Sequence, residues 1–161
     1  MTTAQKKSAN EAKTPKAQEA IALLRADHKA VTMLFEQYES ARSSTKKKAL
    51  VEQICTELTV HAQIEEEIFY PQVQVALKDK ELIPEAIVEH ATLKNLIAQL
   101  EASEPDDEFY DAKVKVLSEY VNHHVKEEQD EMFPKVKASK LNLQAMGEEL
   151  MQRKEELLAK H

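Results

Sequence analysis

"VHAQIEEEIFYP", Val60 to Pro71, places one histidine and three consecutive glutamates in a stretch that otherwise has the pattern of a buried helix. Apolar residues recur there at steps of three and four, which is typical of one buried face of an α-helix. That face consists of Val51, Ile54, Leu58, His61, Glu65 and Ile68. A buried polar group without a partner costs free energy. His61 and Glu65 therefore need partners from elsewhere in the chain.

An internal repeat supplies these partners. "HVKEEQDEMFP", His124 to Pro134, matches "HAQIEEEIFYP" at a distance of 63 residues, so His124 and Glu128 correspond to His61 and Glu65. The corresponding face is Val114, Leu117, Val121, His124, Glu128 and Glu131. Two further faces, 62 residues apart, each contain one histidine: Ile21, Leu24, His28, Val31, Phe35 and Tyr38, and Ile83, Ala86, His90, Leu93, Ile97 and Leu100. The chain is thus predicted to be a helical hairpin that occurs twice.

The composition favours an all-α protein. Among 161 residues there is one glycine, which leaves little room for hairpin turns or glycine-rich phosphate loops. The fold predicted is an antiparallel up-and-down four-helix bundle with an extra C-terminal helix. We expect a disordered tail over residues 1–14, the bundle over 15–138 and an amphipathic helix over 139–161. The first helix is predicted to start at Thr14–Pro15, and Pro71 and Pro134 to kink or end their helices.

Charge and cysteine content exclude several classes of function. A net charge of −7 argues against a nucleic-acid partner, which requires a basic surface. The single cysteine, Cys55, rules out an intrachain disulfide and multi-cysteine metal sites, and an inert buried thiol is expected. No apolar run approaches the ~20 residues of a membrane span, and the N-terminus lacks the apolar segment of a secretory signal. A cytoplasmic protein without membrane association is expected.

The four histidines and two glutamates on the inward faces point to a metal site. A histidine and a glutamate four residues apart lie one turn apart on the same helix face, so each pair can present a nitrogen and an oxygen to one point. Imidazoles and carboxylates suit metals that do not require thiolate ligands, and bridging glutamates are the usual way in which a bundle holds two metals. The candidate ligands are His28, His61, Glu65, His90, His124 and Glu128.

Other polar residues nearby carry weaker predictions. We expect five of them to lie on a solvated face: Glu66, Glu67, Glu127, Gln129 and Asp130. His123 corresponds to Val60 in the repeat and is expected at a boundary between helices. Asp27 and Glu89 directly precede His28 and His90; they either orient an imidazole or are ordinary surface charges.

The pattern His28 … His61-x-x-x-Glu65 … His90 … His124-x-x-x-Glu128 resembles the hemerythrin HHE cation-binding family, over about residues 20–135. The resemblance implies two non-haem iron ions with an oxo or hydroxo bridge, and chemistry with O2, NO or peroxide. It also implies that the four histidines are ligands and that Glu65 and Glu128 are bridging carboxylates.

The sequence departs from the oxygen-carrying members of that family at one ligand. These have a fifth histidine, in an H-x-x-x-H pair on the third helix, whereas His90 has Ala86 and Lys94 at the four-residue positions. Either one metal keeps an open position or another side chain fills it. Glu57 and Tyr120, each one turn before a ligand histidine, are the two additional candidates.

Three functions remain open at this point. The first is a di-iron protein that binds or reacts with O2, peroxide or NO, with a possible peroxide- or NO-consuming oxidoreductase activity and an unknown redox partner. The second is a module that senses oxygen, redox state or iron without turnover. The third, a purely structural bundle, leaves the repeated polar residues unexplained.

Overall fold

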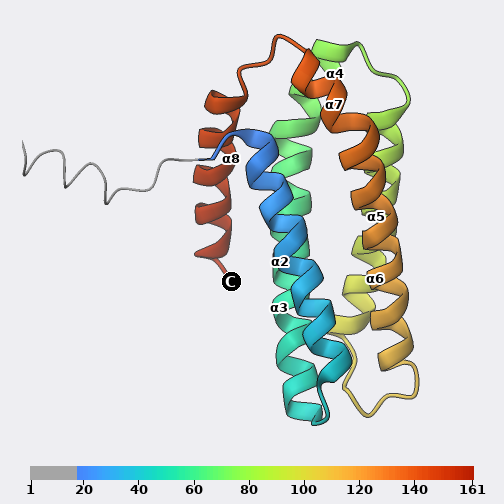
Figure 1. The fold of residues 1–161 in the computed structure, drawn as a ribbon. Helices are drawn as coiled ribbons and strands as arrows, with labels where there is room; N and C mark the ends of the chain where they lie inside the picture. Colours follow the sequence, from blue (N-terminus) through green and yellow to red (C-terminus); the bar gives the residue numbers. More distant parts are fainter. Residues whose placement is uncertain (1–17) are drawn as a thin grey trace, which may run out of the picture.

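The computed structural model describes residues 18–161, which form an all-helical bundle without strands in that part of the chain. The elements are α2 (Ala20–Ser40), α3 (Ser44–Ile64), η1 (Glu65–Phe69), α4 (Tyr70–Leu77), α5 (Leu82–Glu101), α6 (Tyr110–Glu127), η2 (Glu128–Met132), α7 (Phe133–Ala138) and α8 (Leu143–Leu158). Figure 1 shows four antiparallel rods, two of which are the continuous series α3–η1–α4 and α6–η2–α7, with α8 alongside α2. This arrangement confirms the predicted bundle with an extra C-terminal helix.

The first helix of the bundle begins later than the sequence pattern predicted. Ala20 is its first residue, and the Glu19 carboxylate accepts a hydrogen bond from the Ala22 backbone N–H, which is the role of an N-cap. The predicted start at Thr14–Pro15 and the predicted tail over 1–14 lie outside the described residues. Within the described residues, no helix is both long and apolar enough to cross a membrane.

The core consists of two apolar clusters. One contains Phe69, Tyr70 and Phe133, close to the ends of the two longer rods, and packs against α8. The other extends toward the opposite end and contains Val31 and Leu58. Cys55 lies in this second cluster, so its predicted burial is confirmed, and burial raises the pKa of its thiol to about 12. The histidines and glutamates of the inward faces lie between the two clusters.

Two π-helical segments, η1 and η2, begin at Glu65 and Glu128 and alter the helix register after these two glutamates. The Tyr70 N–H donates to the Glu65 carbonyl oxygen, and the Phe133 N–H donates to that of Glu128, five residues back in each case. This wider turn adds one residue, so Phe69, Tyr70, Met132 and Phe133 are buried. The predicted inward position of Glu131 is therefore wrong, because Glu131 is exposed, whereas Ile68 is half-buried and packs against the first apolar cluster.

Pro71 and Pro134 do not end their helices. Each stands in the first turn of the α-helix that follows a π segment, α4 or α7. A proline inside a helix cannot donate to the carbonyl four residues back. Here each proline occurs where the α-helical pattern is already interrupted, which explains why both rods continue past them.

Candidate metal centre

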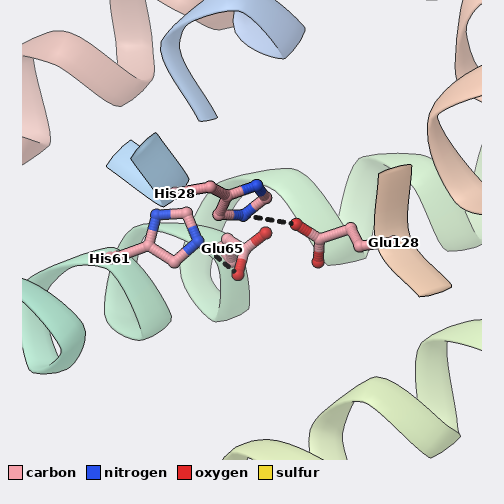
Figure 2. Close-up of side chains that lie close together, drawn as sticks. All are labelled: His28, His61, Glu65 and Glu128. Carbon is pink, nitrogen blue, oxygen red and sulfur yellow. Dashed lines mark ion pairs between the residues drawn. The ribbon is translucent and has the colours of Figure 1, made fainter. Parts of the chain in front are cut away.

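The structure brings the six predicted ligands together from six elements. His28, His61, His90 and His124 come from α2, α3, α5 and α6, and Glu65 and Glu128 are the first residues of η1 and η2. Five of them are buried, and the side chain of His61 is only 11 % exposed. One group of potential ligand atoms comes from His28, His61, Glu65 and Glu128, and a second from Glu65, His90 and His124. Figure 2 shows the first group facing a common point.

Each carboxylate lies against one histidine from each half of the repeat. Glu65 Oε1 is 3.0 Å from His61 Nε2 and 3.3 Å from His90 Nε2. Glu128 Oε1 is 3.2 Å from His28 Nε2, and its Oε2 is 3.4 Å from His124 Nε2. Both carboxylates therefore connect the pair His28–His61 with the pair His90–His124, which is the placement required of a bridging ligand.

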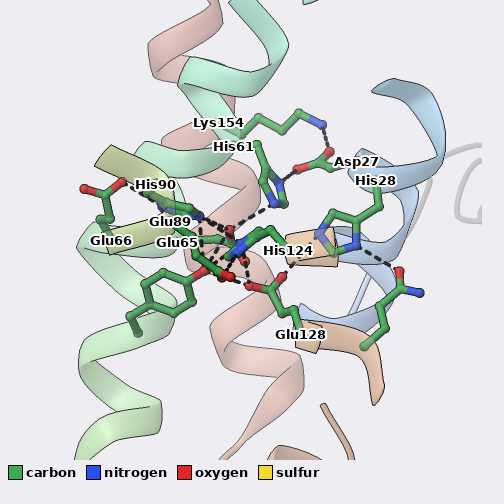
Figure 3. A network of polar contacts seen from close by, with 12 residues as sticks. Asp27, His28, His61, Glu65, Glu66, Glu89, His90, His124, Glu128 and Lys154 are labelled. Carbon is green, nitrogen blue, oxygen red and sulfur yellow. Dashed lines mark hydrogen bonds and ion pairs between the residues drawn. The ribbon is translucent and has the colours of Figure 1, made fainter. Parts of the chain in front are cut away.

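Four outer contacts hold the imidazoles by their other nitrogen, Nδ1 (Figure 3). His61 Nδ1 lies 2.8 Å from Asp27 Oδ2, and His124 Nδ1 lies 2.7 Å from Glu89 Oε1. Each of these two carboxylates thus contacts the histidine of the following long helix and not the histidine beside it in sequence. Of the two alternatives for Asp27 and Glu89, the structure supports imidazole orientation.

The other two outer contacts correct the sequence prediction. His90 Nδ1 lies 2.9 Å from Glu66 Oε2, and His28 Nδ1 lies 2.9 Å from Gln129 Oε1. Both Glu66 and Gln129 were predicted on a solvated face, but they are half-buried against an imidazole. Glu66 and Gln129 directly follow Glu65 and Glu128, so their side chains lie beside the inward face and each reaches an imidazole of a neighbouring helix. Glu66 and Gln129 are repeat counterparts, so the two halves differ here by one charge.

The outer contacts determine which nitrogen of each ring carries the hydrogen. A carboxylate or amide oxygen at Nδ1 accepts from N–H, so the neutral ring has its lone pair on Nε2, directed inward. Inside, each Nε2 meets a carboxylate oxygen, which is also an acceptor. Four inward atoms have no hydrogen-bond partner among the described residues: His28 Nε2, His61 Nε2, Glu65 Oε2 and Glu128 Oε1. Acceptors facing acceptors in a buried site fit a bound cation.

Without a cation, protons must take over that role. Burial alone would raise the pKa of Glu128, but hydrogen bonds from His124 and His28 hold it well below its usual range. Burial alone would lower the pKa of His124, but the hydrogen bonds to Glu128 and Glu89 outweigh it and raise that pKa to about 10. The pKa of His61 is also raised, by the charge of Glu65 and by Asp27, against the effect of burial. The metal-free site therefore holds imidazolium–carboxylate pairs.

Tyr70 is a member of the site that the sequence analysis missed. Its hydroxyl donates to Glu128 Oε2 at 2.7 Å and lies 3.2 Å from His90 Nε2 and 3.3 Å from His124 Nε2. Burial, and then the charges of Glu128 and Glu65, raise the pKa of Tyr70 well above its usual value. Five residues separate Tyr70 from Glu65, a spacing that shares a face only across a π segment. Its repeat counterpart is Phe133, so the two halves differ here as well.

The two additional ligand candidates lie away from these atoms. Tyr120 is 49 % exposed, and Glu57 belongs to neither group of potential ligand atoms. His123, predicted at a helix boundary, has a side chain 64 % exposed, which lies 3.5 Å from Glu89 and 3.4 Å from Glu127. Glu67 binds Arg153 of α8, and Asp130 is exposed.

Comparison with known proteins identifies relatives of this fold and of its histidine pattern. A family model described as Hemerythrin HHE cation binding domain matches residues 19–136. A DNA nickase of Nostoc sp. (strain PCC 7120 / SAG 25.82 / UTEX 2576) is 29% identical over 115 residues, which are 71% of this chain and 32% of that protein. The chain thus spans about a third of the length of that relative.

The fold also matches a crystal structure of a Hemerythrin HHE cation binding domain-containing protein from Mycobacterium kansasii. The TM-score is 0.75 and the sequence identity 24%, and the match covers 89% of each chain. At this identity, the likeness concerns the fold alone.

Proposed function

The chain belongs to the hemerythrin HHE cation-binding family, and on that premise we propose that its cation site holds two non-haem iron ions and reacts with a small oxidant. The oxidants are O2, peroxide or NO. In this proposal His28 and His61 would hold one ion, and His90 and His124 would hold the other. Glu65 and Glu128 would bridge the two ions, and an oxo or hydroxo group would be a further bridge. Iron suits a donor set of imidazoles and carboxylates.

The observation that carries the proposal is the convergence of buried acceptors. Four Nε2 atoms and two carboxylates face one another at 3.0–3.4 Å, with the Nδ1 atoms held from outside. Two cations would give both carboxylates and the lone pairs of all four Nε2 atoms a partner. Two ferrous ions can deliver one electron each to an oxidant, which is the chemistry that such a centre supplies when bound.

The residues around the centre have separate tasks in this proposal. Asp27, Glu66, Glu89 and Gln129 fix the tautomer and orientation of the imidazoles. Tyr70, whose hydroxyl points at His90 and His124, is better placed than Glu57 or Tyr120 to substitute for the missing fifth histidine. As a neutral phenol it can also hold a proton next to Glu128.

A sensing module without turnover is the alternative function. Such a protein would use the same ligands, and ligand binding would change the stability of the bundle instead of producing turnover. Measured consumption of peroxide or NO by the iron-loaded protein separates the two. Sustained turnover supports the reactive centre, whereas binding without turnover supports the sensor.

Metal analysis with optical spectra tests the centre itself. The purified protein should contain about two irons per chain, and its ferric spectrum should change with azide, peroxide or NO. His61→Ala should lose iron, while Tyr120→Phe, at an exposed position, serves as the matched control. A protein that is stable and metal-free in iron-rich growth, or zinc binding unaffected by His61→Ala, would contradict the proposal.

Nucleic acid is not a partner in this proposal. The named relative is a nickase, but the match covers about a third of its length, and the net charge here is −7. A repulsive surface of this kind disfavours binding to phosphates. We expect no retardation of duplex or single-stranded DNA in a gel at low salt, where such binding is strongest; retardation would overturn this point.

A further inference from the structure

A cavity of about 350 Å³ lies directly beside the proposed centre. All four ligand histidines line it, whereas Glu65, Glu128 and Tyr70 do not. On the side away from the imidazoles the wall is formed by Val31, Leu58, Leu93 and Val121, which belong to the second apolar cluster. The cavity therefore separates the imidazoles from that cluster and gives access to the centre from the apolar side.

The cavity opens to solvent beside α2 and α8. Among its lining residues Ala26, Ala30 and Leu158 are exposed, and the first two belong to α2 and the third to the end of α8. Small side chains at 26 and 30 leave this opening free. A molecule can thus enter between the two helices and reach the imidazoles.

The volume is much larger than the small oxidants require. It corresponds to roughly twelve water molecules at ~30 Å³ each, and lies within the ~300–1,000 Å³ range of pockets for organic ligands. O2, NO and hydrogen peroxide would each leave most of the cavity unfilled. The remaining space has walls of valine, leucine and alanine, which suit an apolar group.

The charges in the lining favour a neutral molecule. Lys154 Nζ forms an ion pair with Asp27 Oδ1 at 2.5 Å, so its charge is already compensated. Glu57 is the other acidic group near the opening, and its buried Oε2 has no hydrogen-bond partner among the described residues. A carboxylate-bearing ligand would meet two acids and one occupied lysine. An uncharged alkyl or aryl group is not repelled by these two acids.

We propose that the substrate of this centre is a neutral organic hydroperoxide, ROOH, whose apolar R group occupies the cavity and whose peroxide group faces the imidazoles. This inference rests on the proposed function and narrows it to one substrate class. In the reaction the O–O bond breaks, and two protons from solvent and two electrons yield ROH and water. The electrons come from the two ferrous ions, one from each, and a one-electron donor such as ascorbate must return both ions to the ferrous state before the next turnover.

Binding of the product alcohol tests the cavity independently of turnover. The probe is 2-phenyl-2-propanol, the alcohol formed from cumene hydroperoxide, which binds without reacting. It is titrated into the iron-loaded and metal-free protein and followed by the methyl NMR signals of Val31, Leu58, Leu93 and Val121. Saturable shifts of these signals in both forms are expected. Octanoate, a carboxylate of similar size, should bind at least about tenfold more weakly.

A plug at the opening tests the route of entry. Ala30→Phe places a large side chain in the opening at an exposed position, and Met33→Phe, exposed one turn further along α2 and outside the lining, is the control. Ala30→Phe should weaken alcohol binding by roughly tenfold or more, while Met33→Phe leaves it unchanged. With iron bound, Ala30→Phe should lower kcat/KM for cumene hydroperoxide and spare hydrogen peroxide. If Ala30→Phe fails to fold, Leu158→Trp plugs the same opening from α8.

The outcomes separate this inference from the proposed function. If neither form binds the alcohol, or if hydrogen peroxide is consumed faster than cumene hydroperoxide, the inference is overturned while the centre stands. If octanoate binds as tightly as the alcohol, the inference that the substrate is neutral is wrong. If the protein binds the alcohol but no iron, the proposed function fails and the cavity remains an apolar binding site.

Discussion

The two halves of the site are not chemically equal, and the difference lies in single residues. Glu66 places a carboxylate on His90, whereas Gln129, its repeat counterpart, places a neutral amide on His28. The hydrogen bond from His90 is the main reason why the pKa of Glu66 falls to about 2, against the opposing effect of burial. A carboxylate makes its imidazole a stronger ligand than an amide does.

Exchanging these two residues should therefore change metal affinity in opposite directions. Glu66→Gln should weaken binding of the metal at His90 by roughly 10–100-fold, and Gln129→Glu should tighten binding of the metal at His28. Competition with a chelator of known affinity measures both steps. Asp130→Asn, an exposed neighbour of Gln129, is the control for a change in surface charge. If all variants bind metal with the affinity of the unsubstituted protein, the outer contacts do not influence metal affinity.

Tyr70 is the second residue that distinguishes the halves. Tyr70→Phe should keep the fold, because phenylalanine occupies the equivalent position 133. The loss of the 2.7 Å hydrogen bond to Glu128 should cost the metal-free protein about 1.5–3 kcal/mol of unfolding free energy. Urea unfolding should show a lower midpoint at unchanged slope. Tyr120→Phe, at an exposed position, should have no effect; an equal loss in both variants would contradict the role of Tyr70.

At the scale of helices, the sequence predicted the bundle and the six clustered residues because those depend only on α-helical spacing. His61 and Glu65, or His124 and Glu128, are four residues apart in an unbroken α-helix, and the repeat relates the two pairs. The contacts of Tyr70, Glu66 and Gln129 could not be predicted in that way. The contact of Tyr70 follows from η1, where one added residue changes the helix register after Glu65. Glu66 and Gln129 lie beside the inward face, and only the packing of the neighbouring helices shows which imidazole each one reaches. A proline six residues after each glutamate was the available signal, but it was interpreted as a kink or an end.

The docking of α8 depends on Gly147, the only glycine in the chain. A Cβ at this position would overlap the carbonyl oxygen of Gln18 and lie 2.9 Å from the Ala20 nitrogen. Helix propensity predicts that Gly147→Ala stabilises by ~1 kcal/mol, whereas the overlap with backbone predicts a loss of roughly 1–3 kcal/mol. We expect a loss, measured as a lower Tm. Glu148→Ala, exposed in the same helix, should be neutral or slightly stabilising. Stabilisation by Gly147→Ala would mean that α8 does not pack as described.

At the scale of the whole molecule, the polar layer between two apolar clusters makes stability depend on pH. His124, with its pKa raised to about 10, stabilises the metal-free fold fully below its unfolded value of 6.5 and loses this contribution as pH rises through about 10. Glu128, with a lowered pKa, stabilises above 4.5 and loses its contribution as pH falls below that value. The metal-free protein should thus be most stable between about pH 4.5 and 6.5, and its Tm should decline on both sides of that range. A Tm that rises steadily from pH 7 to 10 would contradict the imidazolium–carboxylate pairs.

Metal binding should replace these protons and so release them. The pKa values of His61 and His124 are raised well above 6.5 by their carboxylate partners against the effect of burial, so these two rings are protonated at pH 7 in the metal-free protein, and the pKa of His90 is shifted in the same direction. A protonated ring cannot bind metal, and each ion must therefore displace at least one proton. Calorimetry in buffers that differ in ionisation enthalpy counts the protons released. The apparent affinity should rise with pH, by about tenfold per unit for each proton displaced.

Tyr70→Phe should release one proton fewer on metal binding if the Tyr70 oxygen is itself a ligand, and the same number if it only donates to Glu128. Binding without proton release would mean that the imidazoles are neutral before the metal arrives, and that the acceptors of the site face one another without protons or metal between them.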